Sequence, residues 1–176
     1  MKKDTFLWQF WGFAFTTFGG ALLHFLYDWT NQSVLAAPFS GVNESTWEHM
    51  KLFYFPWLLF ALVQSYFYAD CPKYWCVKLY GLVTGLFAIP ILFYTYNGVI
   101  GKSPDWINIA IFFIATALAF YVEKRLFEND TFTCRFPKLS LGIILVFGIL
   151  FIIFTFATPK IALFLDPVTQ TYGITK

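Results

Sequence analysis

Five long apolar segments recur along the chain, separated by short polar stretches. They cover approximately residues 6–27, 46–69, 75–98, 104–123 and 139–158. A spanning α-helix needs about 20 mainly apolar residues, and each segment is close to that length. The pattern predicts an all-α integral membrane bundle of five transmembrane helices, forming a single domain over residues 1–176.

Composition supports a membrane location and argues against nucleic-acid binding. Hydrophobic residues make up 59% of the chain and charged residues only 12%, whereas soluble domains carry about 25% charged residues. The net charge of +2 is too small to attract a polyanion. Six of the seven tryptophans lie near predicted span ends, as in an aromatic belt, and only Trp57 lies inside a span. We expect the lipid bilayer to be the principal partner.

The distribution of Lys and Arg predicts the orientation, because basic residues concentrate in cytoplasmic loops. The first apolar segment follows Lys2 and Lys3 and is too long and aromatic for a cleaved signal peptide, so we expect a retained anchor. With the N-terminus inside, the inner side holds eight basic residues: Lys2, Lys3, Lys73, Lys78, Lys124, Arg125, Arg135 and Lys138. The outer side holds four: Lys51, Lys102, Lys160 and Lys176. The prediction is a multi-pass protein of a bacterial plasma membrane with its C-terminus outside.

The three cysteines, Cys71, Cys76 and Cys134, all fall on the predicted inner side. Thiols stay reduced in the cytoplasm, and the C-x4-C spacing of the first two is neither a redox pair nor a familiar zinc pair. We therefore expect free cysteines.

The predicted spans hold only mild polar residues at mid-depth, and Glu123 is placed at an inner end. Pumps, proton relays and voltage sensors need intramembrane charges, so these classes are not expected. Pro56 and Pro90 are expected to bend their helices. Gly81 and Gly85, spaced G-x-x-x-G, are expected to allow close helix packing.

The predicted outer face gathers most of the candidate chemistry. It holds both histidines and several carboxylates and amides, and the candidate ligand-binding residues are His24, Asp28, Asn43, Glu44, Trp47, Glu48, His49, Asp105, Asn108 and Asp166. His24 and Asp28 are four residues apart and share a helix face, while Glu48 and His49 open the next span. Together these four residues could ligate a divalent metal such as Zn²⁺ or iron.

The stretch GVNESTWEHMK, residues 41–51, also has a purely structural interpretation. Ser45 and Glu48 form a capping box, in which Ser45 accepts an amide hydrogen and Glu48 returns to the amide of Ser45. Acidic residues also suit the N-terminal end of the helix dipole. Helix capping alone, ligand contact and metal ligation therefore remain three alternatives for this stretch.

Two further segments belong to the same face. Residues 28–44 form a long, partly apolar loop of the kind that is often functional. The segment 159–176 contains a turn at Asp166 and is interpreted as an interfacial tail, with a lid over an outer cavity as the alternative.

The stretches NESTWEHMKLFYFPWL and DPVTQTYG resemble an uncharacterised family of small bacterial multi-spanning membrane proteins. The resemblance covers most of the chain and implies about five helices and no assigned activity.

Three functional hypotheses follow. The first is a bundle that binds a small ligand, lipid or partner at its extracytoplasmic end. The second is a metal-dependent membrane hydrolase, in which a metal held by His24, His49, Asp28 and Glu48 activates water. The third is an accessory subunit of a larger membrane complex. Whether the chain is an enzyme stays open.

Overall fold

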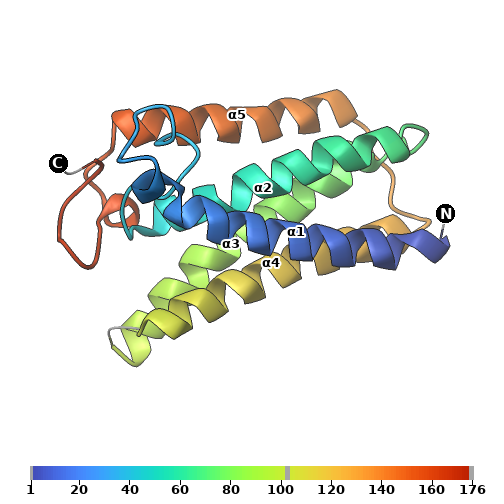
Figure 1. The fold of residues 1–176 in the computed structure, drawn as a ribbon. Helices are drawn as coiled ribbons and strands as arrows, with labels where there is room; N and C mark the ends of the chain where they lie inside the picture. The colour runs from blue at the N-terminus through green and yellow to red at the C-terminus, as the bar shows by residue number, and fades with distance from the viewer. Residues whose placement is uncertain (1, 102–103, 175–176) are drawn as a thin grey trace.

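Five α-helices follow one another along the chain and run back and forth between two ends of the molecule (Figure 1). The computed structural model describes residues 2–101 and 104–174. The helices are α1 (Lys2–Trp29), α2 (Thr46–Phe67), α3 (Tyr74–Val99), α4 (Asp105–Glu128) and α5 (Pro137–Phe156), followed by the 3-10 turn η1 (Ala162–Phe164). Each helix matches one predicted segment, so the all-α prediction is confirmed.

Among the described residues, three helices are long and apolar enough to cross a membrane: α3, α4 from Trp106 to Glu128, and α5. Large apolar side chains also remain exposed on the outside of the bundle, including Phe18 of α1 and Ile149 of α5. An exposed apolar surface of this extent is typical of a membrane-facing surface.

The connections gather at two opposite ends of the bundle (Figure 1). We call one the loop end. It holds residues 30–45, the α3–α4 connection and the segment 157–174. We call the other the N-terminal end, where the start of α1 meets the α2–α3 and α4–α5 connections. Helix α1 packs on α2 and α4, and α3 packs on α2, α4 and α5.

Glycines let α3 lie close to its neighbours, as predicted. A methyl group at Gly81 would lie 2.5 Å from Oε1 of Glu123 in α4, and one at Gly85 would lie 2.4 Å from the ring of Phe53 in α2. Neither distance is sterically allowed, so both positions need a residue without a side chain. Pro56 lies within α2 and Pro90 within α3, as expected.

The interior contains charges, which corrects the expectation of an uncharged core. Lys78 of α3 and Glu123 of α4 are fully buried and form an ion pair with Nζ and Oε2 2.6 Å apart. The charge distribution predicts Lys78 on the inner side of the membrane, and the span boundaries predict Glu123 at an inner span end. Both lie about one to two turns from the ends of their helices, and the packing of α2, α3 and α4 encloses them.

The cysteine prediction is wrong for two of the three residues. Cys76, near the start of α3, forms a disulfide with Cys134 in the α4–α5 connection. Cys71 is free and buried in the α2–α3 connection, as expected. Burial raises the pKa of the Cys71 thiol above its usual value. The disulfide therefore joins the start of α3 to the α4–α5 connection at the N-terminal end.

The C-terminal segment packs onto the loop end of the bundle. Phe164 of η1 is buried and packs on Trp47 of α2, with ring centroids 4.6 Å apart. Leu165 and Tyr172 form an isolated antiparallel bridge. The Asn43 side chain donates a hydrogen bond of 2.9 Å to the carbonyl of Gly173, which ties the tail to the 30–45 loop.

Candidate functional site

Two histidines from different helices meet one glutamate at the loop end. His24 lies in the penultimate turn of α1, His49 in the first turn of α2, and Glu44 in the loop between them. The two imidazole centroids are 6.0 Å apart. Each histidine places Nε2 3.7 Å from a different oxygen of the Glu44 carboxylate. The structure thus brings His24 and His49 together, around Glu44.

These contacts are too long for direct hydrogen bonds, whose nitrogen–oxygen distances are about 2.7–3.2 Å. The Glu44 side chain is 46% exposed, and those of His24 and His49 are 33% and 23% exposed. The carboxylate is therefore partly open to solvent and is not consumed by a tight ion pair. A small donor group beside the carboxylate could bridge it to an imidazole nitrogen.

The backbone fixes the orientation of the His49 ring. Nδ1 of His49 lies 3.0 Å from the carbonyl oxygen of Ser45. A carbonyl can only accept a hydrogen bond, so Nδ1 must carry the proton and donate it. In the neutral imidazole Nε2 is then an acceptor. It faces Glu44, which is also an acceptor when ionised, so a donor between the two would satisfy both groups.

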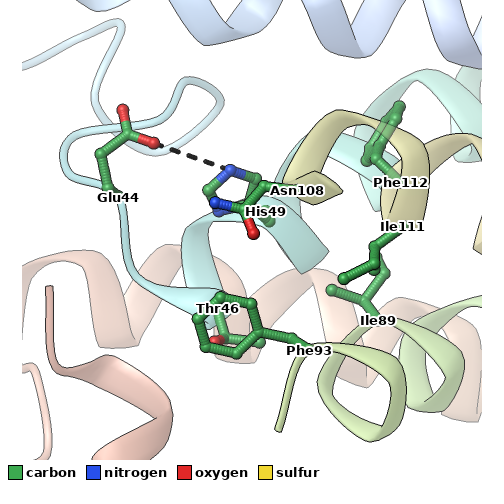
Figure 2. A pocket seen from close by; sticks show the side chains of 8 residues that line it. All are labelled: Glu44, Thr46, His49, Ile89, Phe93, Asn108, Ile111 and Phe112. Atoms are coloured by element: carbon green, nitrogen blue, oxygen red, sulfur yellow. Dashed lines mark ion pairs between the residues drawn. The ribbon is translucent and has the colours of Figure 1, made fainter. Parts of the chain in front are cut away.

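A small pocket opens beside this cluster, between the start of α2, the end of α3 and the start of α4. Figure 2 shows Glu44 and His49 on one side of it, the side chains of Ile89, Ile111 and Phe112 on the other, and the Phe93 ring beside Thr46. Thr46 and Asn108 complete the lining. About 20 Å³ is open to the centres of water molecules, which is room for about one water.

Glu48, the other glutamate of this stretch, does not face the pocket. It is buried and forms an ion pair with Lys51 one turn later, and it accepts a hydrogen bond of 3.1 Å from the backbone nitrogen of Val42. Lys51 in turn donates to the Ala37 carbonyl at 2.8 Å and to the Thr155 hydroxyl at 3.1 Å. The pair therefore fastens the 30–45 loop and α5 to α2.

The capping box is half correct. Ser45 is the N-cap of α2, and its hydroxyl accepts from the Glu48 amide at 3.4 Å. The reciprocal bond is different from the prediction, because the Ser45 amide donates to the Asn43 side chain at 2.9 Å. Glu48 turns inward because Lys51 offers a full opposite charge within reach.

The remaining predicted residues are spread over the loop end. Asp28 is exposed on the last turn of α1, and Trp47 is buried under the tail. Asp166 is buried and accepts hydrogen bonds from the Val168 amide at 2.7 Å and the Thr169 hydroxyl at 2.8 Å, which shapes the tail turn. Asp105 begins α4, and its side chain lies outside the described part of the structure.

The four-residue metal set has no support in this arrangement. Among the side chains that the structure describes, no group of three or more His, Cys, Asp or Glu is arranged to hold a metal ion. Asp28 is exposed and Glu48 is paired with Lys51, so neither joins the two histidines.

Sequence reasoning missed the interior polar cluster around Lys78 and Glu123. Trp57 donates a hydrogen bond of 2.8 Å to Oε1 of Glu123, and Lys78 donates one of 3.1 Å to Oε1 of the Gln64 side chain. The ammonium of Lys78 also lies 5.1 Å from the Trp57 ring centroid, in cation–π contact. The available signal was Gly81, which lies one turn after Lys78 and leaves space for Glu123.

This interior cluster has the properties of a structural element. Both charges are fully buried and each is directly paired. The cluster links α2, α3 and α4 through side chains alone. The solvent-accessible chemistry is at the loop end.

Over residues 1–174 the chain matches a family described only as a family of unknown function, DUF6512. No curated protein and no solved structure matches the chain.

Proposed function

The chain belongs to DUF6512, a family of unknown function, and from that premise we propose that it is an integral membrane protein that binds a small ammonium cation at its loop end. The observation that carries the proposal is the Glu44 carboxylate, held 3.7 Å from Nε2 of both His24 and His49. The Glu44 carboxylate and Nε2 of His49 are two neighbouring acceptors that fit a ligand with N–H donors and a positive charge.

Charge and hydrogen-bonding capacity favour a cation over an anion. Glu44 brings a carboxylate to the pocket, and no Lys or Arg is among the residues that line it. An ammonium group has several N–H donors, which can serve the Glu44 carboxylate and Nε2 of His49, two groups that line the same pocket. A hydrogen bond between two ionised groups is also about twice as strong as one between neutral groups.

The pocket walls suit the same ligand. Phe93 and Phe112 present aromatic rings to the pocket, and Ile89 and Ile111 make the rest of its far wall apolar (Figure 2). Aromatic rings attract cations within about 6 Å. An apolar wall accommodates a methyl group better than a second charge. Ammonium and methylammonium are therefore the best-fitting probes.

The size of the pocket limits the ligand. Space for about one water admits ammonium without rearrangement. Tetramethylammonium is larger and has no N–H donor, so it should neither fit nor satisfy the acceptors. A comparison of ammonium with tetramethylammonium therefore distinguishes specific binding from a general effect of salt.

The membrane setting of the proposal has five spans, with the loop end outside. Three helices meet the length and hydropathy needed for a span, and α1 and α2 lie alongside them in the same bundle. Lys51 and Lys78 are buried, so they are left out of the count of basic residues in the loops. Removing them leaves seven basic residues at the N-terminal end and three at the loop end, so the charge bias still places the N-terminal end in the cytoplasm. For a bacterial plasma membrane protein, the site would face the outside.

Thermal unfolding of the purified protein in detergent tests the proposal. We expect ammonium and methylammonium chloride to raise the melting temperature above that in tetramethylammonium chloride of equal ionic strength. Glu44→Gln should remove this difference, because it removes the charge. Asp70→Asn is the matched control, since Asp70 is an exposed carboxylate at the opposite end.

Two outcomes would contradict the proposal. One is an equal response of the wild type and Glu44→Gln to every cation. The other is stabilisation by micromolar Zn²⁺ that is lost in His24→Ala and His49→Ala, which would favour the metal-dependent alternative.

A further inference from the structure

A groove opens on the outside of the bundle between α1 and α4, toward the N-terminal end and far from the proposed ammonium site. Its walls are mainly aromatic, with Phe6 and Phe13 from α1 and Phe120 from α4. About 200 Å³ is open to the centres of water molecules. In the proposed membrane setting this groove faces lipid.

The groove contains a buried carboxamide that has no protein partner. Gln9 lines the groove and is 4% exposed. Neither its Oε1 nor its Nε2 has a hydrogen-bond partner among the residues that the structure describes. A buried polar group without a partner is destabilising, and hydrocarbon offers it none. The unpaired Gln9 side chain therefore indicates a ligand that both accepts and donates hydrogen bonds.

A cation lies at the cytoplasmic end of the same groove. Lys124 lines the groove one turn after Phe120, and its Nζ lies 3.1 Å from the Glu128 carboxylate. An ammonium group has three donors, so this contact leaves donors for a phosphate. The side chain is 30% exposed, and the adjacent Arg125 is also exposed.

The order of these groups matches the order of groups in a phospholipid. Gln9 is about 10 Å from the start of α1, at 1.5 Å per residue. Lys124 is about 6 Å from the end of α4 by the same measure. Phe13 and Phe120 lie nearer the middle of the bilayer than Gln9 and Lys124, whereas Phe6 lies nearer the N-terminal end. An acyl chain, an ester carbonyl and a phosphate would meet the walls, Gln9 and Lys124 in turn.

We propose that this groove binds phosphatidylglycerol from the cytoplasmic leaflet. One acyl chain lies against Phe13 and Phe120. Nε2 of Gln9 donates to an ester carbonyl, and Oε1 accepts from a headgroup hydroxyl. Lys124 contacts the phosphate. Phosphatidylcholine has the same chains and ester groups but lacks both the headgroup hydroxyl and the net negative charge, so it should bind more weakly.

Native mass spectrometry of the detergent-purified protein, titrated with either lipid, tests the proposal. We expect tighter binding of phosphatidylglycerol than of phosphatidylcholine with identical chains. Gln9→Met keeps the length of the side chain and removes its hydrogen bonds, so phosphatidylglycerol affinity should fall about three- to tenfold, the range for one or two hydrogen bonds. Lys124→Gln should reduce the preference for the anionic lipid.

Matched controls separate this site from general lipid adhesion. Lys138→Gln removes an exposed cation from the same end of the molecule, away from the groove, and should bind as the wild type does. Ala117→Phe fills the groove without changing Gln9, whereas Leu118→Phe adds a ring at an exposed position outside the groove lining. Only the first should weaken binding.

Gln9→Met should melt at or above the wild-type temperature without lipid, because it removes an unpaired polar group. This distinguishes lost binding from misfolding, and Ala117→Phe tests the site independently if Gln9→Met unfolds. Wild-type affinity for phosphatidylglycerol in both Gln9→Met and Ala117→Phe would overturn the proposal. Equal affinity of the wild type for the two lipids would also overturn it.

Discussion

Lys78 and Glu123 carry opposite charges at a place where neither reaches water. Both side chains are fully buried. Glu123 also accepts a hydrogen bond from Trp57, and Lys78 also donates one to the Gln64 side chain. Removing two charges from solvent is costly, and their attraction offsets this cost only when the pair is intact. The pair therefore contributes more to specifying how α3 and α4 align than to net stability.

This interpretation predicts strong coupling between the two residues. Glu123→Gln leaves the Lys78 ammonium buried without its counter-charge and should destabilise the protein by about 3–5 kcal/mol. Lys78→Met should have a similar effect. The double variant should lose clearly less than the sum of the two single losses, as measured by chemical denaturation in detergent. Strictly additive losses would show that the two side chains act independently.

Cys71 gives a prediction about pH. Burial raises the pKa of its thiol, so at a given pH the folded protein holds less of the reactive thiolate than an exposed cysteine does. Maleimide labelling of the folded protein should be slow at neutral pH and rise as the pH increases above the usual thiol pKa. By linkage, ionisation at high pH favours the unfolded state, so any stability effect appears as a loss with rising pH. Labelling at the rate of free cysteine would contradict this.

At the residue scale the sequence predicts contacts within one helix turn better than contacts between helices. The bond from the Glu48 amide to Ser45 follows from spacing along α2. The partner of Glu123 depends instead on how α3 lies against α4, and nothing in the spacing of either helix specifies that alignment. The partner of the two histidines could not be chosen from spacing either. It is Glu44 from the loop, and not Asp28 or Glu48 from the helices.

At the scale of elements, the length of each apolar segment is sufficient to predict a helix, and all five are present. The ends are set by local signals, such as Ser45 at the start of α2 and Pro137 at the start of α5. The neighbours of each helix depend on small residues that allow close approach. Gly81 and Gly85 gave that signal for α3, although not the identity of the partner helix.

A pair of glycines in the same helix tests this packing argument. Gly81→Ala should destabilise the bundle by about 1–3 kcal/mol, because the added methyl group overlaps the Glu123 side chain. Gly98→Ala, where an added methyl group meets no atom within 4 Å, should be neutral or stabilise by up to about 1 kcal/mol. Thermal unfolding of both variants measures the difference. Equal melting temperatures would exclude close packing as the role of Gly81.

At the scale of the whole molecule, two signals disagree about orientation. The charge bias places the N-terminal end in the cytoplasm, whereas the Cys76–Cys134 disulfide at that end is typical of an oxidising compartment. The charge bias is the stronger signal because it draws on seven residues from several segments.

A reporter fused to the C-terminus decides between the two orientations in a bacterial host. Alkaline phosphatase is active only outside the cytoplasm, and green fluorescent protein exported unfolded stays dark there. We expect an active phosphatase fusion and a dark fluorescent fusion. The opposite pair of results would place the proposed ammonium site in the cytoplasm and the disulfide outside.

We propose above all that Glu44, together with His24 and His49, binds a small ammonium cation at the loop end, and a calorimetric titration of ammonium into the protein in lipid nanodiscs tests this. We expect saturable binding to the wild type and to Asp70→Asn, and at least tenfold weaker binding to Glu44→Gln, because a charge-assisted hydrogen bond is lost. Equal affinity of the wild type and Glu44→Gln, or no saturable binding to the wild type, would contradict it.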